Sequence, residues 1–194
     1  MTRRIVLITA VFLASCIIGP ALDQIHVIGG ALSYAHPWLF GQAWWVGPQF
    51  GLAFAGICAA SLLVQHHFGT RTPEPTHTAR VGQQAAWFVA AYLTTGILWE
   101  HPWLVAALLA AGLLVRLASV RPDAASVRTI LVLALAGTAY EALVASLPGT
   151  FDYTLTGGAP VPVWLPLLYA HGAPLLRTFA KNATAAFNRT AAAT

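Results

Sequence analysis

The segment from residue 41 to residue 64 contains no charged side chain and is apolar along most of its length. At about 1.5 Å per residue, a helix of this length can cross the ~30 Å hydrocarbon core of a bilayer. Two adjacent tryptophans, Trp44 and Trp45, stand near its start, and tryptophan is enriched where a membrane meets water. The segment therefore predicts a transmembrane helix, and it limits the chain to folds that a bilayer can hold.

Five further apolar segments have the same character. Of all residues, 58% are hydrophobic and only 8% are charged, whereas a soluble domain is typically ~25% charged. The sequence predicts an all-α, polytopic membrane protein whose six transmembrane helices form a compact bundle and a single domain over residues 1–194. The predicted spans cover residues 5–22, 41–64, 81–98, 103–120, 129–147 and 161–176, and a basic tail follows at 177–194.

The positions of the basic residues support this division. All ten Lys and Arg residues precede span one, lie between spans two and three, surround the connection of spans four and five, or follow span six. The opposite connections hold Asp23, Glu100 and Asp152. Because Lys and Arg accumulate in cytoplasmic loops, the pattern predicts that both termini are cytoplasmic. Arg116, near the end of span four, is expected to extend toward the headgroups.

Small residues recur along one face of span two. Gly47, Gly51 and Ala55 are four positions apart, a pattern that lets another helix approach closely in lipid. We expect span two to be the central helix of the bundle, with its first turns loosened by Pro48. The small face serves either packing within the chain or the contact of an interaction module with a second molecule.

Glu141 is the only carboxylate well inside a predicted span. An unpaired charge at that depth is costly, so the side chain must face the bundle, a partner or water. Two interpretations stay open: a polar anchor in a cavity, with Thr138 and Tyr140 nearby, or a hydrogen bond to a Gln, Ser or Thr of another helix. Gln42 and Gln49, which flank the two tryptophans, have the same two interpretations.

Motifs of known enzymes are absent from the sequence. It has no phosphate-binding loop, dinucleotide-binding glycine pattern, nucleophile elbow or zinc-protease motif. Among the histidines only His66 and His67 are adjacent, which does not match a metal cluster. Cys16 and Cys58 both lie in apolar runs and are expected to be free, buried thiols. We predict a protein that is not an enzyme and has no metal, cofactor or nucleic-acid partner.

The residues Ala43-Trp44-Trp45-Val46-Gly47-Pro48, followed by Gly51, resemble a motif of the Insig (insulin-induced gene) family. Trp164-Leu165-Pro166 at the start of the last span and Tyr153-Thr154 before it are similar to further family positions. The resemblance covers nearly the whole chain, and the short loops suggest a prokaryotic homologue. It implies a six-helix bundle that binds a hydroxylated lipid, in the plasma membrane if prokaryotic and in the endoplasmic reticulum in eukaryotic relatives.

The resemblance also implies which functions are retained. Phe88 matches a family phenylalanine that lies next to the sterol. The family aspartate that supports partner binding aligns with Ser119, and Asp123 is only nearby. The Gly-rich continuation after Gly172 is missing as well. Retention of a sterol-sensing partner is therefore in doubt, whereas lipid binding depends less on these positions.

Together these observations predict a lipid-binding membrane protein whose ligand is a sterol or a diacylglycerol-like lipid in an intramembrane cavity. Two other classes stay open: a small transporter or channel, suggested by Glu141, and a structural interaction module built on the small face of span two. A membrane-protein partner or a homo-oligomer is possible in each case, and residues 65–80 form either a partner surface or a solvated loop. The candidate ligand-binding residues are Gln42, Trp45, Gln49, Phe88, Tyr92 and Glu141.

Overall fold

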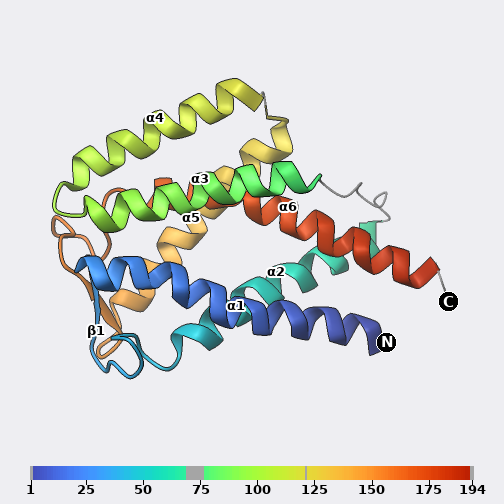
Figure 1. The fold of residues 1–194 in the computed structure, drawn as a ribbon, viewed down its shortest axis with the longest axis horizontal. Coiled ribbons are helices and arrows are strands. Elements are labelled where there is room, and N and C mark those ends of the chain that lie inside the picture. Colours follow the sequence, from blue (N-terminus) through green and yellow to red (C-terminus); the bar gives the residue numbers. More distant parts are fainter. Residues whose placement is uncertain (1, 69–76, 121, 193–194) are drawn as a thin grey trace.

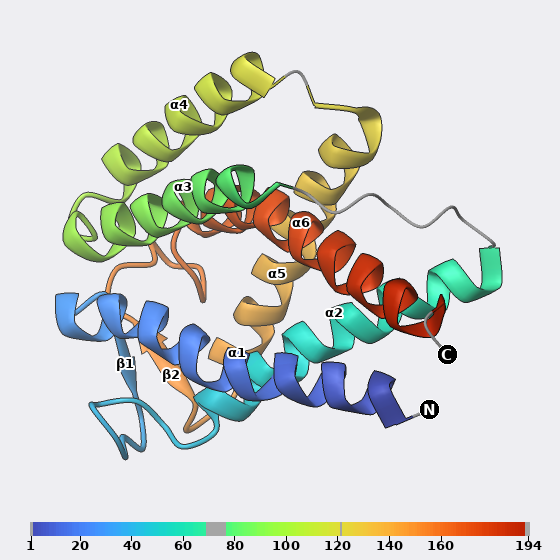
Figure 2. The same ribbon diagram turned by 45° about the vertical axis from the view of Figure 1, so that its right-hand side comes forward.

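The computed structural model describes residues 2–68, 77–120 and 122–192, and within them the chain forms six helices (Figure 1). Their bounds are α1 Thr2–Gly29, α2 Val46–Phe68, α3 Thr78–Ile97, α4 Pro102–Val120, α5 Ala124–Ala145 and α6 Leu165–Ala192. The helices alternate in direction, so that both termini lie at the same end of the bundle (Figures 1 and 2). The predicted helical class and the six helices are confirmed.

Three segments of the described chain are long and apolar enough to cross a membrane by length and composition. They are Ile8–Gly29, Pro102–Ser119 and Ala124–Ala145. Many large apolar side chains on these helices point outward, among them Ile17 (73% exposed) and Leu135 (71% exposed). An outer surface of this kind suits lipid, which is as apolar as these side chains.

The helix α1 continues to Gly29, beyond the predicted end of span one at residue 22. Asp23, which was expected in an outer loop, therefore lies in the helix and is 8% exposed. The helix stops at Gly30, whose φ of 83° is the left-handed conformation that commonly ends helices. The sequence prediction placed the end at Asp23 because a charged residue usually leaves an apolar span, and here the charge is buried instead.

The helix α2 starts at Val46, five residues after the predicted start of span two. Phe40 and Gly41 have φ values of 53° and 82°, which a helix cannot contain, and Leu39 and Gln42 form a β-bridge around them. Pro48 lies in the first turn of α2, where backbone N–H groups need no partner within the helix. The loosening predicted at Pro48 therefore has no physical basis.

Helix α6 extends to Ala192, so the predicted tail at 177–194 is helical over nearly all of its length. Pro174 lies inside this helix, where its ring removes one backbone hydrogen bond. The helix begins directly after Trp164, and Trp164 and Leu165 are both 1% exposed. Apolar packing at its first turn and polar residues along its last turns explain why the sequence showed only a short span.

Two short strands were not predicted. Strand β1 Leu32–Tyr34 pairs antiparallel with β2 Phe151–Tyr153, with Ser33 opposite Asp152. The pair lies at the end of the bundle opposite to the termini (Figure 2). Tyr34 and Phe151 face the helices and are buried with Leu32, Ala43 and Val46 in one apolar cluster.

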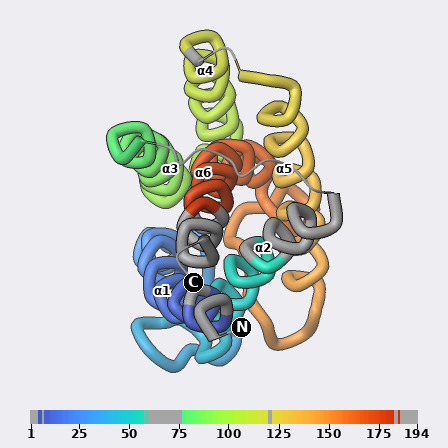
Figure 3. The backbone as a smooth tube through the Cα atoms, turned by 90° about the vertical axis from the view of Figure 1, so that its right-hand side faces the viewer, coloured from blue at the N-terminus to red at the C-terminus, as the bar shows by residue number. Residues whose placement is uncertain are grey.

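The central helix is α6, and the prediction that span two is central was wrong. Helix α6 contacts each of the other five helices, whereas α2 contacts only α1 and α6 among the described helices. Viewed from the end of the bundle that carries the termini, α6 lies between the other helices (Figure 3). Leu165 and Leu168 of its first turn, together with Trp164 just before it, form the main buried cluster with Val105 and Leu109 of α4.

The small face of α2 packs against α1 of the same chain. A Cβ atom on Gly51 would lie 2.6 Å from Cys16 Sγ, and one on Gly47 would lie 3.1 Å from the Cys16 carbonyl oxygen. The approach at Gly51 leaves no room for a side chain and the one at Gly47 is tight, which supports packing within the chain as the role of this face. Cys16 is a free thiol and is half-buried. The side chain of Cys58 and residues 69–76 of the predicted loop at 65–80 lie outside the described part of the structure.

Candidate functional site

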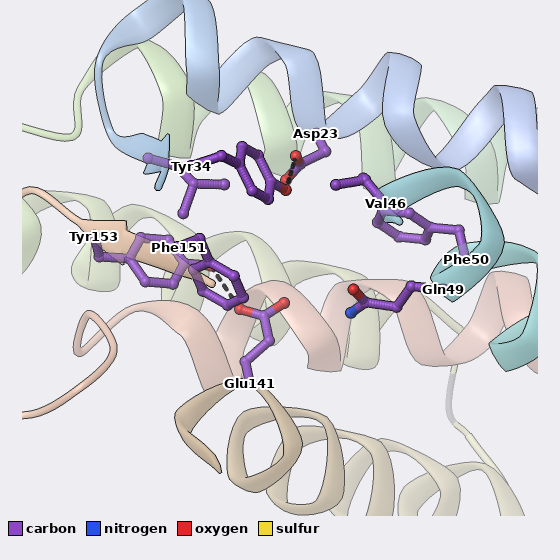
Figure 4. A pocket seen from close by; sticks show the side chains of 9 residues that line it. Asp23, Tyr34, Val46, Gln49, Phe50, Glu141, Phe151 and Tyr153 are labelled. Carbon is purple, nitrogen blue, oxygen red and sulfur yellow. Dashed lines mark hydrogen bonds between the residues drawn. The ribbon is translucent and has the colours of Figure 1, made fainter. Parts of the chain in front are cut away.

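A small cavity lies where the sheet meets the helices (Figure 4). It contains about 20 Å³ that the centre of a water molecule can occupy, which is room for a water molecule or a hydroxyl group. Two carboxylates, Asp23 and Glu141, face it from α1 and α5. Its lining consists of Asp23, Leu32, Tyr34, Val46, Gln49, Phe50, Glu141, Phe151 and Tyr153.

Asp23 is held on one side of the cavity by two donors. The Tyr34 hydroxyl donates to Oδ2 at 2.6 Å, and Gln42 Nε2 donates to the same oxygen at 3.1 Å. Gln42 also donates to the carbonyl oxygen of Pro20 at 2.9 Å, which fixes the turn after β1 onto α1. The extension of α1 past residue 22 is what carries the carboxylate to this position.

Glu141 is held on the other side by two tyrosines. Tyr153 of β2 donates to Oε2 at 2.5 Å, and Tyr169 of α6 donates to Oε1 at 2.8 Å. Gly137, one turn earlier on α5, makes room for the Tyr169 ring, since a Cβ atom there would lie 2.4 Å from it. Glu141 thus lines a cavity and is also hydrogen-bonded, and its partners are tyrosines rather than the expected Gln, Ser or Thr.

His26 connects the Asp23 side of the cavity to α3. Its Nδ1 atom lies 3.9 Å from Asp23 Oδ1, and its Nε2 atom lies 2.7 Å from Thr95 Oγ1. The ring is 2% exposed and packs against Tyr92 and Trp164, with ring centroids 5.0 and 5.6 Å away. The buried ring therefore keeps Asp23 in place through polar and aromatic contacts with α3 and with the segment before α6.

The two strand tyrosines of the site stay protonated. Burial, followed by the negative charge of Asp23, raises the pKa of Tyr34 far above its usual value. Burial, followed by the charge of Glu141, likewise raises the pKa of Tyr153 well above the usual value. Both phenols are therefore hydrogen-bond donors at neutral pH, each committed to one carboxylate.

Four of the six predicted binding residues gather at this site. Gln49 and Glu141 line the cavity, and their side chains point toward one another across it (Figure 4). Gln42 supports Asp23 from behind. Trp45 packs against Tyr34 and Phe151 with centroid separations of 5.5 and 6.3 Å, so it backs two wall residues without lining the cavity.

The other two predicted residues lie deeper, on α3. Phe88 and Tyr92 pack edge to face at 5.0 Å and belong to the buried cluster around Trp164. Neither lines the cavity. Phe88 instead packs against Gly172 of α6, where a Cβ atom would lie 2.9 Å from its ring. A ligand contact for these two residues stays a prediction.

Sequence reasoning missed Asp23, Tyr34, Phe151 and Tyr153 as parts of the site. A signal was available for Asp23, because His26 follows it at helical spacing on a helix that stays apolar on both sides. The alternation in Leu32-Ser33-Tyr34 and in Phe151-Asp152-Tyr153 is typical of strands. Each run has only three residues, which is too short to predict a strand with its partner.

Most polar groups that face the cavity are hydrogen-bond acceptors. Two carboxylates and the Gln49 amide face it, and the tyrosine donors are already engaged. The residues that the structure describes contain no group of three His, Cys, Asp or Glu side chains placed to hold a metal ion. A hydroxyl group is small enough for the space and can donate to a carboxylate while it accepts from the amide.

Comparison with known proteins identifies the fold. Neither a family model nor a curated protein sequence matches the chain. Two crystal structures do: the mycobacterial Insig homologue MvINS from Mycobacterium vanbaalenii, and a cross-linked trimer of MvINS. Each match has a TM-score of 0.74 and 24% sequence identity, and covers 93% of this chain and 95% of the other. The chain therefore has the fold of an Insig homologue, and the resemblance seen in its sequence is confirmed at the level of the fold.

Proposed function

We propose that this chain is a non-enzymatic integral membrane protein of the Insig type, which holds a hydroxylated apolar lipid, a sterol or a diacylglycerol-like molecule, by its hydroxyl group. The observation that carries the proposal is the pair of carboxylates, Asp23 and Glu141, that face one small cavity at the end of an apolar bundle. The similarity of the fold to MvINS supports it.

The hydrogen-bonding capacity of the cavity favours a hydroxyl ligand. A carboxylate offers about four acceptor sites, and the two tyrosines on Glu141 use only one on each oxygen. The Gln49 amide adds a donor and an acceptor. A lipid hydroxyl can donate to a carboxylate and accept from the amide, whereas an ester can only accept and a methyl group can do neither.

The apolar body of the lipid lies outside this cavity, because the space holds only the polar end. Helices α2 and α5 both line the cavity, yet they do not pack directly against each other in the described residues. The lipid body is placed between these two helices, next to Val46 and Phe50. Phe88 and Tyr92 would contact only a ligand that reaches across to α3.

The proposal also covers localisation and assembly. Both termini and the start of α3 lie at one end of the bundle (Figure 1). Arg80 is in the first turn of α3 and Lys181 is in the C-terminal half of α6, and we assign that end to the cytoplasmic side of the plasma membrane. A homo-oligomer is part of the proposal, since MvINS has been crystallised as a cross-linked trimer.

The test is native mass spectrometry of the detergent-purified protein, before and after incubation with cholesterol or dioleoylglycerol. The wild type and Glu100→Gln, an exposed carboxylate outside the site, should carry lipid in defined stoichiometry. Glu141→Gln should lose it, because the amide offers one acceptor oxygen in place of two. A wild-type protein that stays bare with both lipids contradicts the proposal and favours a transporter or a structural module.

A further inference from the structure

Arg116 on α4 is buried in the bundle instead of extending to the headgroups as expected, with 7% of its surface exposed. Its Nη1 group donates to the His171 carbonyl oxygen of α6 at 2.9 Å. Its Nη2 group is buried and has no hydrogen-bond partner among the described residues. An ionised side chain within a membrane helix usually marks a functional site, and its partner has to be identified.

The neighbouring helices offer no counter-charge to this guanidinium. Helices α3 and α6 pack against α4, and the sequences of all three lack Asp and Glu. Elsewhere, Asp23 and Glu141 face the cavity described above, Asp123 pairs with Arg177, and Glu100 and Asp152 are exposed. Glu74 lies outside the described residues. A buried charge without an opposite charge is strongly destabilising, so the site is suited to an anion that comes from outside the chain.

Two further buried polar atoms that lack partners among the described residues lie on the helices that pack against α4, one on His171 of α6 and one on Gln84 of α3. His171 is 2% exposed and donates from Nε2 to the Leu109 carbonyl oxygen at 2.9 Å, while its Nδ1 atom has no partner in the described chain. The ring stacks on Trp87 of α3, with centroids 6.3 Å apart. Gly112 of α4 lies beside both rings, since a Cβ atom there would be 3.5 Å from each.

Gln84 is placed at the level of Arg116. Its Oε1 atom is buried without a partner in the described residues. Trp87 lies beside Gly112, and α3 and α4 run in opposite directions (Figure 1). Gln84 is one turn before Trp87 and Arg116 is one turn after Gly112, so both side chains belong to the same layer. Rotation of the amide lets Gln84 present either an acceptor or a donor.

We propose that Arg116 binds the anionic oxygen group, a carboxylate or a phosphate ester, of a membrane amphiphile between α3, α4 and α6. The planar guanidinium matches two oxygens of such a group. The site shares no helix with the lining of the Asp23–Glu141 cavity, which comes from α1, α2, α5 and the two strands.

The position of the site selects an amphiphile over a soluble ion. Arg116 lies within Pro102–Ser119, one of the segments apolar enough to cross a membrane. Helix α4 is at the edge of the bundle (Figure 1), where, of its described residues, only Leu113 and Leu117 join the cluster that contains Ile130 of α5. Large apolar side chains of α4 such as Leu108 and Val115 are exposed. An acyl chain can therefore lie in the bilayer beside α4 while its anionic end reaches Arg116.

The test measures the thermal-unfolding midpoint of the purified protein in a neutral detergent with matched pairs of lipids. Oleate is compared with methyl oleate, and dioleoyl phosphatidic acid with its dimethyl ester, so that the charge differs within a pair and no member carries a free hydroxyl group for the Asp23–Glu141 cavity. At least one anionic member should raise the midpoint well above its neutral match, and the pair that responds identifies a carboxylate or a phosphate. Equal shifts within both pairs would overturn the proposal, and this comparison needs only the wild type.

Two variants then locate the effect. Arg116→Met should lower the affinity for the anionic lipid at least about tenfold, so that about ten times more lipid is needed for the same shift of the midpoint. Without lipid, this variant should unfold at a higher temperature than the wild type, because an unpaired buried charge is removed. Arg128→Met, which removes an exposed arginine, should keep the response. A response that survives in Arg116→Met, or one produced equally by inorganic phosphate, contradicts the proposed amphiphile site.

Discussion

Arg177 of α6 and Asp123 at the start of α5 form a bidentate ion pair, with Nη1 2.6 Å from Oδ1 and Nη2 3.0 Å from Oδ2. Asp123 also accepts a hydrogen bond from the Ser126 backbone N–H at 2.8 Å and so caps α5. Arg177 contacts the Ser126 hydroxyl as well. The carboxylate nearest to the partner-binding position of the Insig family is thus engaged within the chain, where it joins α5 to α6.

Asp123→Asn should lower the thermal-unfolding midpoint at neutral pH and weaken its dependence on acid. The hydrogen bonds from Arg177, followed by those from Ser126, hold the pKa of Asp123 well below its usual value. A lowered pKa gives stability that is present above the unfolded value of about 4 and lost as the pH falls toward the folded one. The effect should shrink in high salt, because the pair is exposed. Asp152→Asn, on an exposed strand position, should show neither change.

Gly51→Leu should destabilise the protein by about 1–3 kcal/mol through overpacking. A side chain at Gly51 would overlap Cys16 and the ring of Phe12, whose nearest atoms lie 2.6 and 2.8 Å from the ideal Cβ position. The same substitution at Gly56, which has nothing within 4 Å, is the matched control and should be neutral. Size-exclusion chromatography should give the same elution for both variants, since the Gly51 face is used within the chain. Dissociation of an oligomer by Gly51→Leu alone would show instead that the face joins two copies.

Tyr169→Phe should destabilise the protein by about 1–3 kcal/mol, because it removes the donor to Glu141 Oε1 and leaves a buried acceptor unpaired. It should also increase the fraction of protein that retains lipid, since the freed Glu141 oxygen can accept a hydrogen bond from a ligand hydroxyl. Tyr140→Phe alters the residue next to Glu141 in the chain, but Tyr140 is 47% exposed and should tolerate the change. Equal unfolding midpoints for the two variants would mean that the Tyr169 hydrogen bond contributes nothing.

Alkaline pH should unfold the protein through the strand tyrosines. Burial and the neighbouring carboxylates raise the pKa of Tyr34 and of Tyr153. A raised pKa contributes stability that is complete below the unfolded value of about 10 and is lost as the pH rises above it. Absorbance of tyrosinate and circular dichroism should therefore change together above that pH. The double variant Tyr34→Phe/Tyr153→Phe should lose less stability over that range than either single variant, whereas titration of tyrosinate without unfolding would contradict the expectation.

The six helices could be predicted because lipid imposes one requirement, an apolar run long enough to satisfy its own backbone hydrogen bonds. Helix ends were harder to predict. Asp23 looks like a loop residue in the sequence, yet Tyr34 and Gln42 hold it inside the bundle from eleven and nineteen positions away. The end of α1 thus depends on contacts that no local pattern contains.

Glu141 is a part of the site that could be predicted from the sequence. A lone carboxylate inside a span indicates a polar site by itself. Its partners, Tyr153 and Tyr169, come from a three-residue strand and from α6, and neither their identity nor that of Asp23 across the cavity follows from spacing. Arg116 was misplaced for a related reason, since snorkelling was assumed where the His171 carbonyl group of α6 draws the side chain inward.

The central position of α6 has a consequence for biosynthesis. Helix α6 follows the other five in the sequence, so the ribosome makes it after them, yet each of the five packs against it. Membrane helices insert first and associate afterwards, and α1 and α2 can pair as soon as both are made. Helices α4 and α5 are inserted before α6 is made. Until then, Arg116 lacks the His171 carbonyl group and Glu141 lacks the Tyr169 hydroxyl group. Insertion of α6 therefore supplies these hydrogen bonds and completes the polar contacts of helices made before it.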